Sequence, residues 1–468
     1  MGSAAALLTF SFYIFNFLCT STTPLVSQLR ASNDVKGAID IGKQSLTLAI
    51  LLGILLAITL STFSQPLLYV MGTANSGINA NQMALSFLHI RAWAAPAVFI
   101  LSASTGILRG FLDTKTTFVV LLGGNIVNFA LDVILIPGMG LGPTGAAIAT
   151  TTAEWICALL FLGILAGKIP SIDQELGSNQ ILIRYNEATE STEKTKREEP
   201  IIITPATKPT SWESIQPLII ASSSVFLRSF VLQVCLVGAA AMAARGGGTT
   251  TIHSQEASIA SAANIAAYQI ALQLWLLCSF ICDALAAASQ ALIADALGRE
   301  DEKDVRRITN AILYSSIGLG IFLGGMLGLG KETGFLLNFF TSDKPTQEAL
   351  VSIVPILVLA QPLNSFVFAA DGILQGASEF PFQAKSMALS AFVGIASFYY
   401  LEYLSAGTTY SSSAAAMLVG GGSDDTLVHV WFGLIALQAM RGLTSIWKLV
   451  DSSGPIDLLS KREKSYFN

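Results

Sequence analysis

The sequence predicts an all-α, polytopic membrane protein whose helices form two parallel-repeat lobes. Hydrophobic residues make up 52% of the 468 residues and charged residues only 12%, whereas a soluble domain carries about 25% charged residues. Apolar segments long enough to span a bilayer recur along the chain. A short motif also occurs twice. The first two observations exclude an ordinary soluble fold, and the third predicts an internal repeat.

Apolar runs of spanning length predict eleven transmembrane helices. Proline and glycine inside such runs are tolerated in membrane helices. The predicted spans cover residues 4–29, 44–70, 84–108, 117–137, 144–167, 214–240, 264–293, 308–330, 350–374, 382–403 and 426–449. The first five spans form an N-terminal lobe, residues 1–167, and the last six form a C-terminal lobe, residues 212–450.

Polar and charged residues separate the two lobes and set their orientation. Residues 168–211 are rich in Glu, Lys, Ser and Thr and predict a flexible linker. Most of the 26 Lys and Arg residues lie in this linker, in loops on the same side and in a tail, residues 451–468. Because basic residues mark the cytoplasmic side, we expect the linker and the tail to be cytoplasmic.

The repeated motif relates the two lobes. Pro96 precedes Gly-Ile-Leu-Arg-Gly, and Pro362 precedes Gly-Ile-Leu-Gln-Gly at the same spacing, 266 residues further along. Gly53 and Gly320 are separated by 267 residues. Both copies of the motif end a span on the basic side, so the repeats are parallel. This arrangement predicts two lobes with a cavity between them.

The same alignment leaves the N-terminal lobe one helix short of the C-terminal lobe. Met1 aligns with the second span of its repeat rather than with the first. We therefore expect that this lobe lacks its first helix, through an incomplete gene model or as a real short isoform. The alternative is an authentic eleven-helix protein.

Five segments resemble the multidrug and toxic compound extrusion (MATE) transporters. They are RGFLDTKT at 109–116, NIVNFALDVILI at 125–136, GPTGAAIATT at 142–151, AADGILQGASEF at 369–380 and VWFGLIALQAMRG at 430–442. The segment at 369–380 is most similar to the plant-type branch, which includes exporters of citrate and phenolic acids. The resemblance implies a twelve-helix fold and secondary antiport.

Three polar residues of the predicted span 117–137 share one helix face. Asn125, Asn128 and Asp132 recur at intervals of three and four residues. An acid inside a membrane span is costly and is a functional candidate, because it can bind Na⁺ or take up a proton. The resemblance implies that Asn128, Asp132 and Thr150 belong to the family's cation site. The alternative is a hydrogen-bonded packing cluster.

A second polar stripe follows the predicted span 350–374. Gln361, Asn364, Asp371 and Gln375 step at helical intervals and should face the central cavity. The resemblance implies a coupling role for Asp371. The alternative is that Asp371 supports a local break in the helix.

The predicted span 264–293 adds a third stripe. Gln269, Gln273 and Asp283 fall near one face, where Asp283 is a further coupling candidate and the two glutamines are cavity candidates. Arg91 and Arg228 lie near span ends, where we expect them to snorkel or to pair.

These patterns favour a secondary antiporter that exports an organic acid, a phenolic or a drug-like compound in exchange for H⁺ or Na⁺. The sequence has no Gly-x4-Gly-Lys-Ser/Thr motif for ATP, and no Ser-His pairing or His-rich cluster indicates an enzyme or a metal site. We expect a monomer in the bilayer of the plasma membrane, a plastid or a vacuole, with no nucleic-acid partner and no cofactor besides the coupling ion. The alternatives are a lipid-linked-sugar flippase of related fold and a non-transporting truncated protein.

Overall fold

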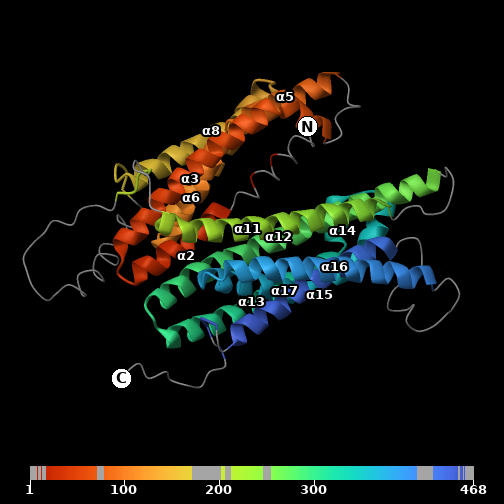
Figure 1. Ribbon diagram of the computed structural model, residues 1–468. Helices are drawn as coiled ribbons and strands as arrows, with labels where there is room; N and C mark the ends of the chain where they lie inside the picture. The colour runs from red at the N-terminus through yellow and green to blue at the C-terminus, as the bar shows by residue number, and fades with distance from the viewer. Residues whose placement is uncertain are drawn as a thin grey trace, which may run out of the picture. The chain divides into compact units, whose positions relative to one another are not determined.

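The computed structural model describes most of the chain, and Figure 1 shows its helices. The described residues are 8, 12, 17–70, 78–170, 202–205, 212–245, 255–407, 425–451, 454–456 and 458. Regular structure in these ranges is helical throughout. The predicted all-α class is therefore confirmed, whereas most of the predicted linker and tail lie outside the described residues.

The chain divides into two compact units. The N-terminal unit comprises residues 1–226 and 298–300, and the C-terminal unit comprises residues 227–297 and 301–468. The N-terminal unit contains α2 (Phe17–Ala31), α3 (Val35–Thr62), α4 (Ser64–Val70), α5 (Ile78–Ala92), α6 (Ala95–Gly110), α7 (Thr114–Val133), the π-helix η2 (Ile134–Gly138) and α8 (Gly142–Leu165). The helix α11 (Trp212–Arg245) runs from the first unit into the second.

The C-terminal unit continues with six further helices. They are α12 (Gln255–Gly298), α13 (Glu302–Glu332), α14 (Phe335–Phe340), α15 (Lys344–Gly376), α16 (Phe380–Gly407) and α17 (Asp425–Val450). Its largest apolar cluster joins α12, α13, α15 and α17 around the buried rings of Tyr268 and Trp431.

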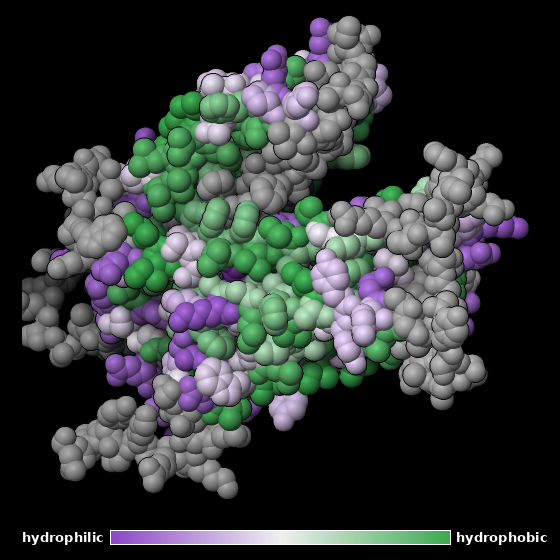
Figure 2. All heavy atoms as spheres, turned by 45° about the vertical axis from the view of Figure 1, so that its right-hand side comes forward, coloured by the Kyte–Doolittle hydropathy of each residue, from purple (hydrophilic) through white to green (hydrophobic). Residues whose placement is uncertain are grey.

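The chain is a multi-pass integral membrane protein. Among the described residues, nine helices are long and apolar enough to cross a membrane, or ten when α5 and α6, bent by 42°, count as one span. These ten correspond to ten of the eleven predicted spans. The remaining one, residues 4–29, lies partly outside the described residues, and α2 covers its second half. Figure 2 shows many hydrophobic residues on the visible face, as expected for a surface that contacts lipid.

Several helices begin earlier than hydropathy predicts. The predicted span 44–70 is wrong at both ends, because α3 starts at Val35 and ends at Thr62. The physical reason at the start is a side-chain cap: Asp34 accepts a hydrogen bond of 2.9 Å from the N–H of Gly37. Asp301 caps α13 in the same way, at 3.0 Å from the N–H of Asp304. The first turns of both helices are polar and extend beyond the apolar segment.

Packing inside each unit repeats the motif found in the sequence. A Cβ atom on Gly53 would lie 2.5 Å from the Cα of Pro96, and a Cβ on Gly320 would lie 2.5 Å from the Cα of Pro362. These approaches bring α3 against α6 in one unit and α13 against α15 in the other. The motif recurs because each unit needs a glycine where a second backbone comes this close.

Candidate functional site

The predicted cation-site residues of the N-terminal unit lie on α7, just before the π-helix η2. Asn128 and Asp132 are half-buried. In the described part of the chain, neither Oδ1 of Asn128 nor Oδ1 of Asp132 has a hydrogen-bond partner, although both atoms are buried. Buried acceptors without a partner are uncommon and costly. Two such oxygens one turn apart can help to bind a cation, and the carboxylate of Asp132 can instead take up a proton.

Asn125 and Thr150 occupy different surroundings. Asn125 is exposed, and its amide donates a hydrogen bond of 2.8 Å to the carbonyl of Leu121 in its own helix. Thr150 lies on α8, which packs against α7, and its hydroxyl donates to the carbonyl of Ala146 at 3.0 Å. The structure thus separates Asn125 from the half-buried pair and places Thr150 on a helix adjacent to that pair.

An ion pair joins two helices of the N-terminal unit, and sequence analysis did not identify its acid, Glu154. Arg91 at the end of α5 donates to both carboxylate oxygens of Glu154 in α8, at 2.5 and 2.9 Å. The guanidinium also lies 5.4 Å from the ring centre of Phe12. Arg91 therefore pairs rather than snorkels. The overlooked signal was the single acid in the predicted span 144–167.

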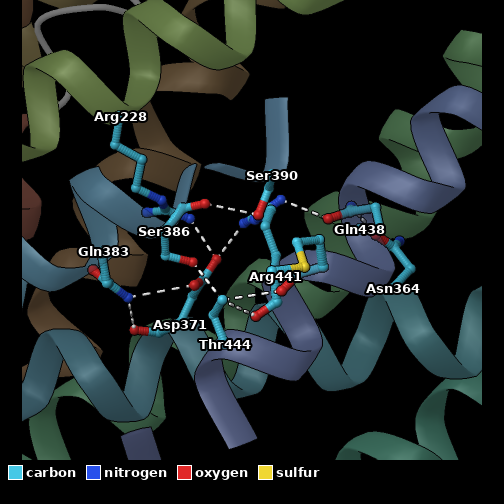
Figure 3. Close-up of polar contacts among 10 residues, drawn as sticks. Arg228, Asn364, Asp371, Gln383, Ser386, Ser390, Gln438, Arg441 and Thr444 are labelled. Atoms are coloured by element: carbon cyan, nitrogen blue, oxygen red, sulfur yellow. Dashed lines mark hydrogen bonds and ion pairs between the residues drawn. The ribbon is translucent and has the colours of Figure 1, made fainter. Parts of the chain in front are cut away.

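The second polar stripe forms a buried network in the C-terminal unit. Asp371 on α15 accepts hydrogen bonds through Oδ2 from Arg228 on α11, at 2.5 Å, and from Arg441 on α17. Its Oδ1 lies 3.3 Å from Nε2 of Gln383 on α16. Figure 3 shows these side chains converging from the four helices. We call Arg228, Asp371, Gln383 and Arg441 the Asp371 cluster.

The network continues from the Asp371 cluster as a line of amides. Arg441 donates to Oε1 of Gln438 at 2.6 Å, and Gln438 donates to Oδ1 of Asn364 at 3.1 Å. The amide of Asn364 then reaches Oγ of Ser279 at 3.2 Å and Oε1 of Gln361 at 3.4 Å. Each of these hydrogen bonds provides a partner for polar atoms that would be costly to bury without one.

This placement bears on both interpretations of the stripe. Gln361, Asn364 and Asp371 are buried within the unit, and Gln375 is half-buried. Their lining of a cavity stays a prediction. The helix α15 is continuous from Lys344 to Gly376, so the suggestion that Asp371 supports a local break is wrong.

The third predicted stripe lies on an exposed face of α12. Gln269, Gln273 and Asp283 are all exposed. They therefore lie outside the face of the helix that carries Tyr268, Cys278 and Cys282, which pack in the apolar cluster. In the described residues, no group of three His, Cys, Asp or Glu side chains has the arrangement of a metal site.

The structure also pairs residues to which the sequence assigned no role. Glu402 on α16 lies 2.9 Å from Nδ1 of the buried His429 on α17. Gln383, Gln438 and Arg441 complete the buried network. Pattern analysis could not reveal the links between helices, because their partners lie on different helices, 12 to 74 residues apart in sequence.

Comparison with known families gives one match over much of the chain. The family model described as MatE matches residues 1–134 and 256–400, which together are more than half of the 468 residues.

Curated relatives come from plants and bacteria. Protein DETOXIFICATION 43 of Arabidopsis thaliana is 28% identical over 425 residues, which cover 90% of this chain and 66% of the relative. Protein DETOXIFICATION 44, chloroplastic, of the same plant is 28% identical over 459 residues, covering 95% and 74%. DNA damage-inducible protein F of Escherichia coli is 23% identical over 384 residues, covering 82% and 73%. The chain thus spans about two thirds of the length of the first of these relatives.

Solved structures share the fold. A structure titled "Crystal structure of MATE in the straight conformation" superposes with a TM-score of 0.74 at 16% identity, covering 96% of this chain and 87% of the other. A second, an outward-facing conformation of a multidrug resistance MATE family transporter of the MOP superfamily, gives 0.74 at 17% identity, with 95% and 86% covered. At this identity the likeness establishes the fold alone.

Proposed function

The chain belongs to the MATE family of transporters, in its plant-type branch, and from this premise we propose that it is a secondary antiporter. It exports an organic substrate in exchange for H⁺ or Na⁺ by alternating access of its two lobes. The substrate classes that fit are organic acids, phenolics and drug-like compounds. Family membership argues against the lipid-linked-sugar flippase considered from the sequence.

The observation that carries this proposal is the pair of unpartnered oxygens on α7. Oδ1 of Asn128 and Oδ1 of Asp132 are buried without a hydrogen-bond partner among the described residues. In an apolar lobe this is unfavourable unless a proton or a cation occupies the site during part of the cycle. These atoms support the assignment of Asp132 as the coupling acid, with Asn128 beside it and Thr150 on the adjacent helix.

Coupling follows from differential binding. The ion and the substrate each shift the balance between inward-open and outward-open states only if they bind the two states with different affinity. We infer that loading Asp132 favours one state and that release of the ion on the other side of the membrane returns the transporter. The ion gradient then provides the free energy for substrate export.

The test is the variant Asp132→Asn in the full-length protein. We expect gradient-driven efflux of ethidium and of benzoate from cells that lack their own exporters to fall to background, because an amide cannot gain or lose a proton and binds a cation weakly. The amount of protein in the membrane should not change. A matched control is Glu332→Gln, since the side chain of Glu332 is 79% exposed at the end of α13.

Two outcomes would contradict the proposal in different ways. Unchanged efflux in Asp132→Asn would remove Asp132 from the coupling step. Absence of efflux in the wild-type protein with every ion gradient tested would instead favour the non-transporting alternative. Repeating the assay with a pure Na⁺ gradient and with a pure H⁺ gradient identifies the coupling ion.

A further inference from the structure

The Asp371 cluster holds two guanidinium groups against one carboxylate. Arg228 and Arg441 both donate to Oδ2 of Asp371, so a single oxygen serves two cations. Among the described residues, Oδ1 of Asp371 accepts a hydrogen bond from the neutral amide of Gln383. Within these three ionised side chains positive charge exceeds negative charge by one. Because the cluster is largely buried, water screens this charge only in part, and the excess favours an anion beside the exposed part of Arg228.

The two arginines differ in how available they are. The side chain of Arg441 is 5% exposed and also donates to Gln438. The side chain of Arg228 is 17% exposed. Arg228 makes one hydrogen bond within the described residues, from Nη2 to Asp371, whereas a guanidinium carries five N–H donors. Arg228, the more exposed of the two arginines, thus has further N–H groups that can donate hydrogen bonds to a ligand.

The spare donors suit a carboxylate. A guanidinium presents parallel N–H groups that match the two oxygens of a carboxylate, and such bidentate pairs are among the strongest hydrogen bonds in proteins. Asp371 already demonstrates that a carboxylate fits between the two arginines. Hydroxyl groups of Ser386 and Thr444, 2.5 Å apart, stand beside the cluster in Figure 3.

We propose that Arg228, with Arg441 behind it, forms a binding site for the carboxylate group of an organic anion, and that Asp371 occupies this site as an internal ligand. A substrate carboxylate binds Arg228 and displaces Asp371 from it. This inference deepens the proposed transport function and rests on it for the meaning of the ligand as a substrate. It assigns anion recognition to the C-terminal unit, whereas the cation or proton is assigned to α7.

The test measures equilibrium binding to the purified full chain in phosphatidylcholine nanodiscs, without any ion gradient. The probe is radiolabelled benzoate, and the uncharged benzamide is its matched control ligand. Arg228→Gln should weaken benzoate binding at least about tenfold through loss of a charge-assisted contact and leave benzamide unchanged. Asp371→Asn should strengthen benzoate binding by a similar factor, because the internal competitor loses its charge.

A control variant removes the same charge elsewhere. The side chain of Arg307 is 81% exposed and pairs with Asp304 at the start of α13, so Arg307→Gln should bind benzoate as the wild type does. Thermal unfolding shows whether each variant is folded. If Asp371→Asn fails to fold, benzoate binding by Arg228→Gln is sufficient to test the proposal, because that variant leaves Asp371 paired with Arg441.

Specific results would overturn the proposal. If Arg228→Gln bound benzoate with wild-type affinity, the cluster would have a structural role only. The same conclusion would follow if Arg228→Gln weakened benzamide binding as much as benzoate binding. Loss of benzoate binding when phosphatidylglycerol is added would identify a lipid headgroup as the ligand. The binding assay needs no gradient, so it can be separated from the transport assay. Benzoate binding that depends on Arg228, without any export, would contradict the antiporter proposal and leave this site in place. Export that is unchanged in Arg228→Gln would contradict this site and leave the antiporter proposal in place.

Discussion

Among single residues, the charged groups inside the helices carry the most information. Arg91 and Glu154 form a bidentate pair whose side chains are 10% and 20% exposed. Removing one partner of a buried pair leaves an uncompensated charge, whereas replacing both with apolar groups is often neutral. The pair therefore fixes the position of α5 against α8 more than it adds net stability. It holds the helix end at which α5 and α6 bend.

This view of the pair leads to a prediction about unfolding. We expect Glu154→Gln to destabilise the protein by about 3–5 kcal/mol, since Arg91 would keep a buried charge without its counter-ion. The double variant Arg91→Met/Glu154→Leu should recover most of that loss. Thermal unfolding in nanodiscs measures both. A double variant less stable than Glu154→Gln would mean that the pair itself contributes the stability.

The same residues mark the limit of what the sequence predicts about the site. Asp132, Asn128 and Asp371 were identifiable because an acid in an apolar segment is conspicuous on its own helix. The partners of Asp371 were not, because Arg228 lies 143 residues and Arg441 lies 70 residues away. Periodicity reports which residues share a face, but it carries no information about which face of another helix lies opposite.

At the level of elements, the spans were predictable and their ends were not. Hydropathy locates ten of the eleven spans, because the bilayer requires about 20 apolar residues in each helix. It misses the polar first turns of α3 and α13, which Asp34 and Asp301 cap. A helix ends where its backbone groups find other partners, and this depends on one residue rather than on an average over many.

Two glycines of α13 provide a matched comparison. A Cβ on Gly320 would meet the backbone of Pro362 at 2.5 Å, while a Cβ on Gly325 has nothing within 4 Å. We expect Gly320→Ala to destabilise by about 1–3 kcal/mol through overpacking. Gly325→Ala should be neutral or stabilising, because alanine favours a helix by up to about 1 kcal/mol. Chemical unfolding in detergent measures the free energy of unfolding of both variants. Equal changes in that free energy would show that the close approach of Gly320 to Pro362 does not limit the side chain at position 320.

For the whole molecule, orientation in the membrane remains the main prediction. The distribution of Lys and Arg places the start of α13 on the cytoplasmic side and the start of α15 on the opposite side. Lys303 and Lys344 are exposed at these two positions. Among the native cysteines, Cys19, Cys157, Cys278 and Cys282 are buried and Cys235 is half-buried, which favours a low labelling background.

The orientation can be tested with two single-cysteine additions. A membrane-impermeant maleimide should label Lys344→Cys in intact cells and Lys303→Cys only after permeabilisation. The reverse pattern would show that the chain is inverted, and labelling of both in intact cells would show that one loop is misassigned.

The line of hydrogen bonds from Ser279 to Gln383 has a mechanical consequence. It ties α12, α15, α16 and α17 together through buried side chains. A slide of α15 by a turn, about 5.4 Å, would break several of these ties at once, because Asn364 and Asp371 both lie on α15. The C-terminal unit should therefore behave as a stiff block, and engineered staples between its helices should leave turnover intact.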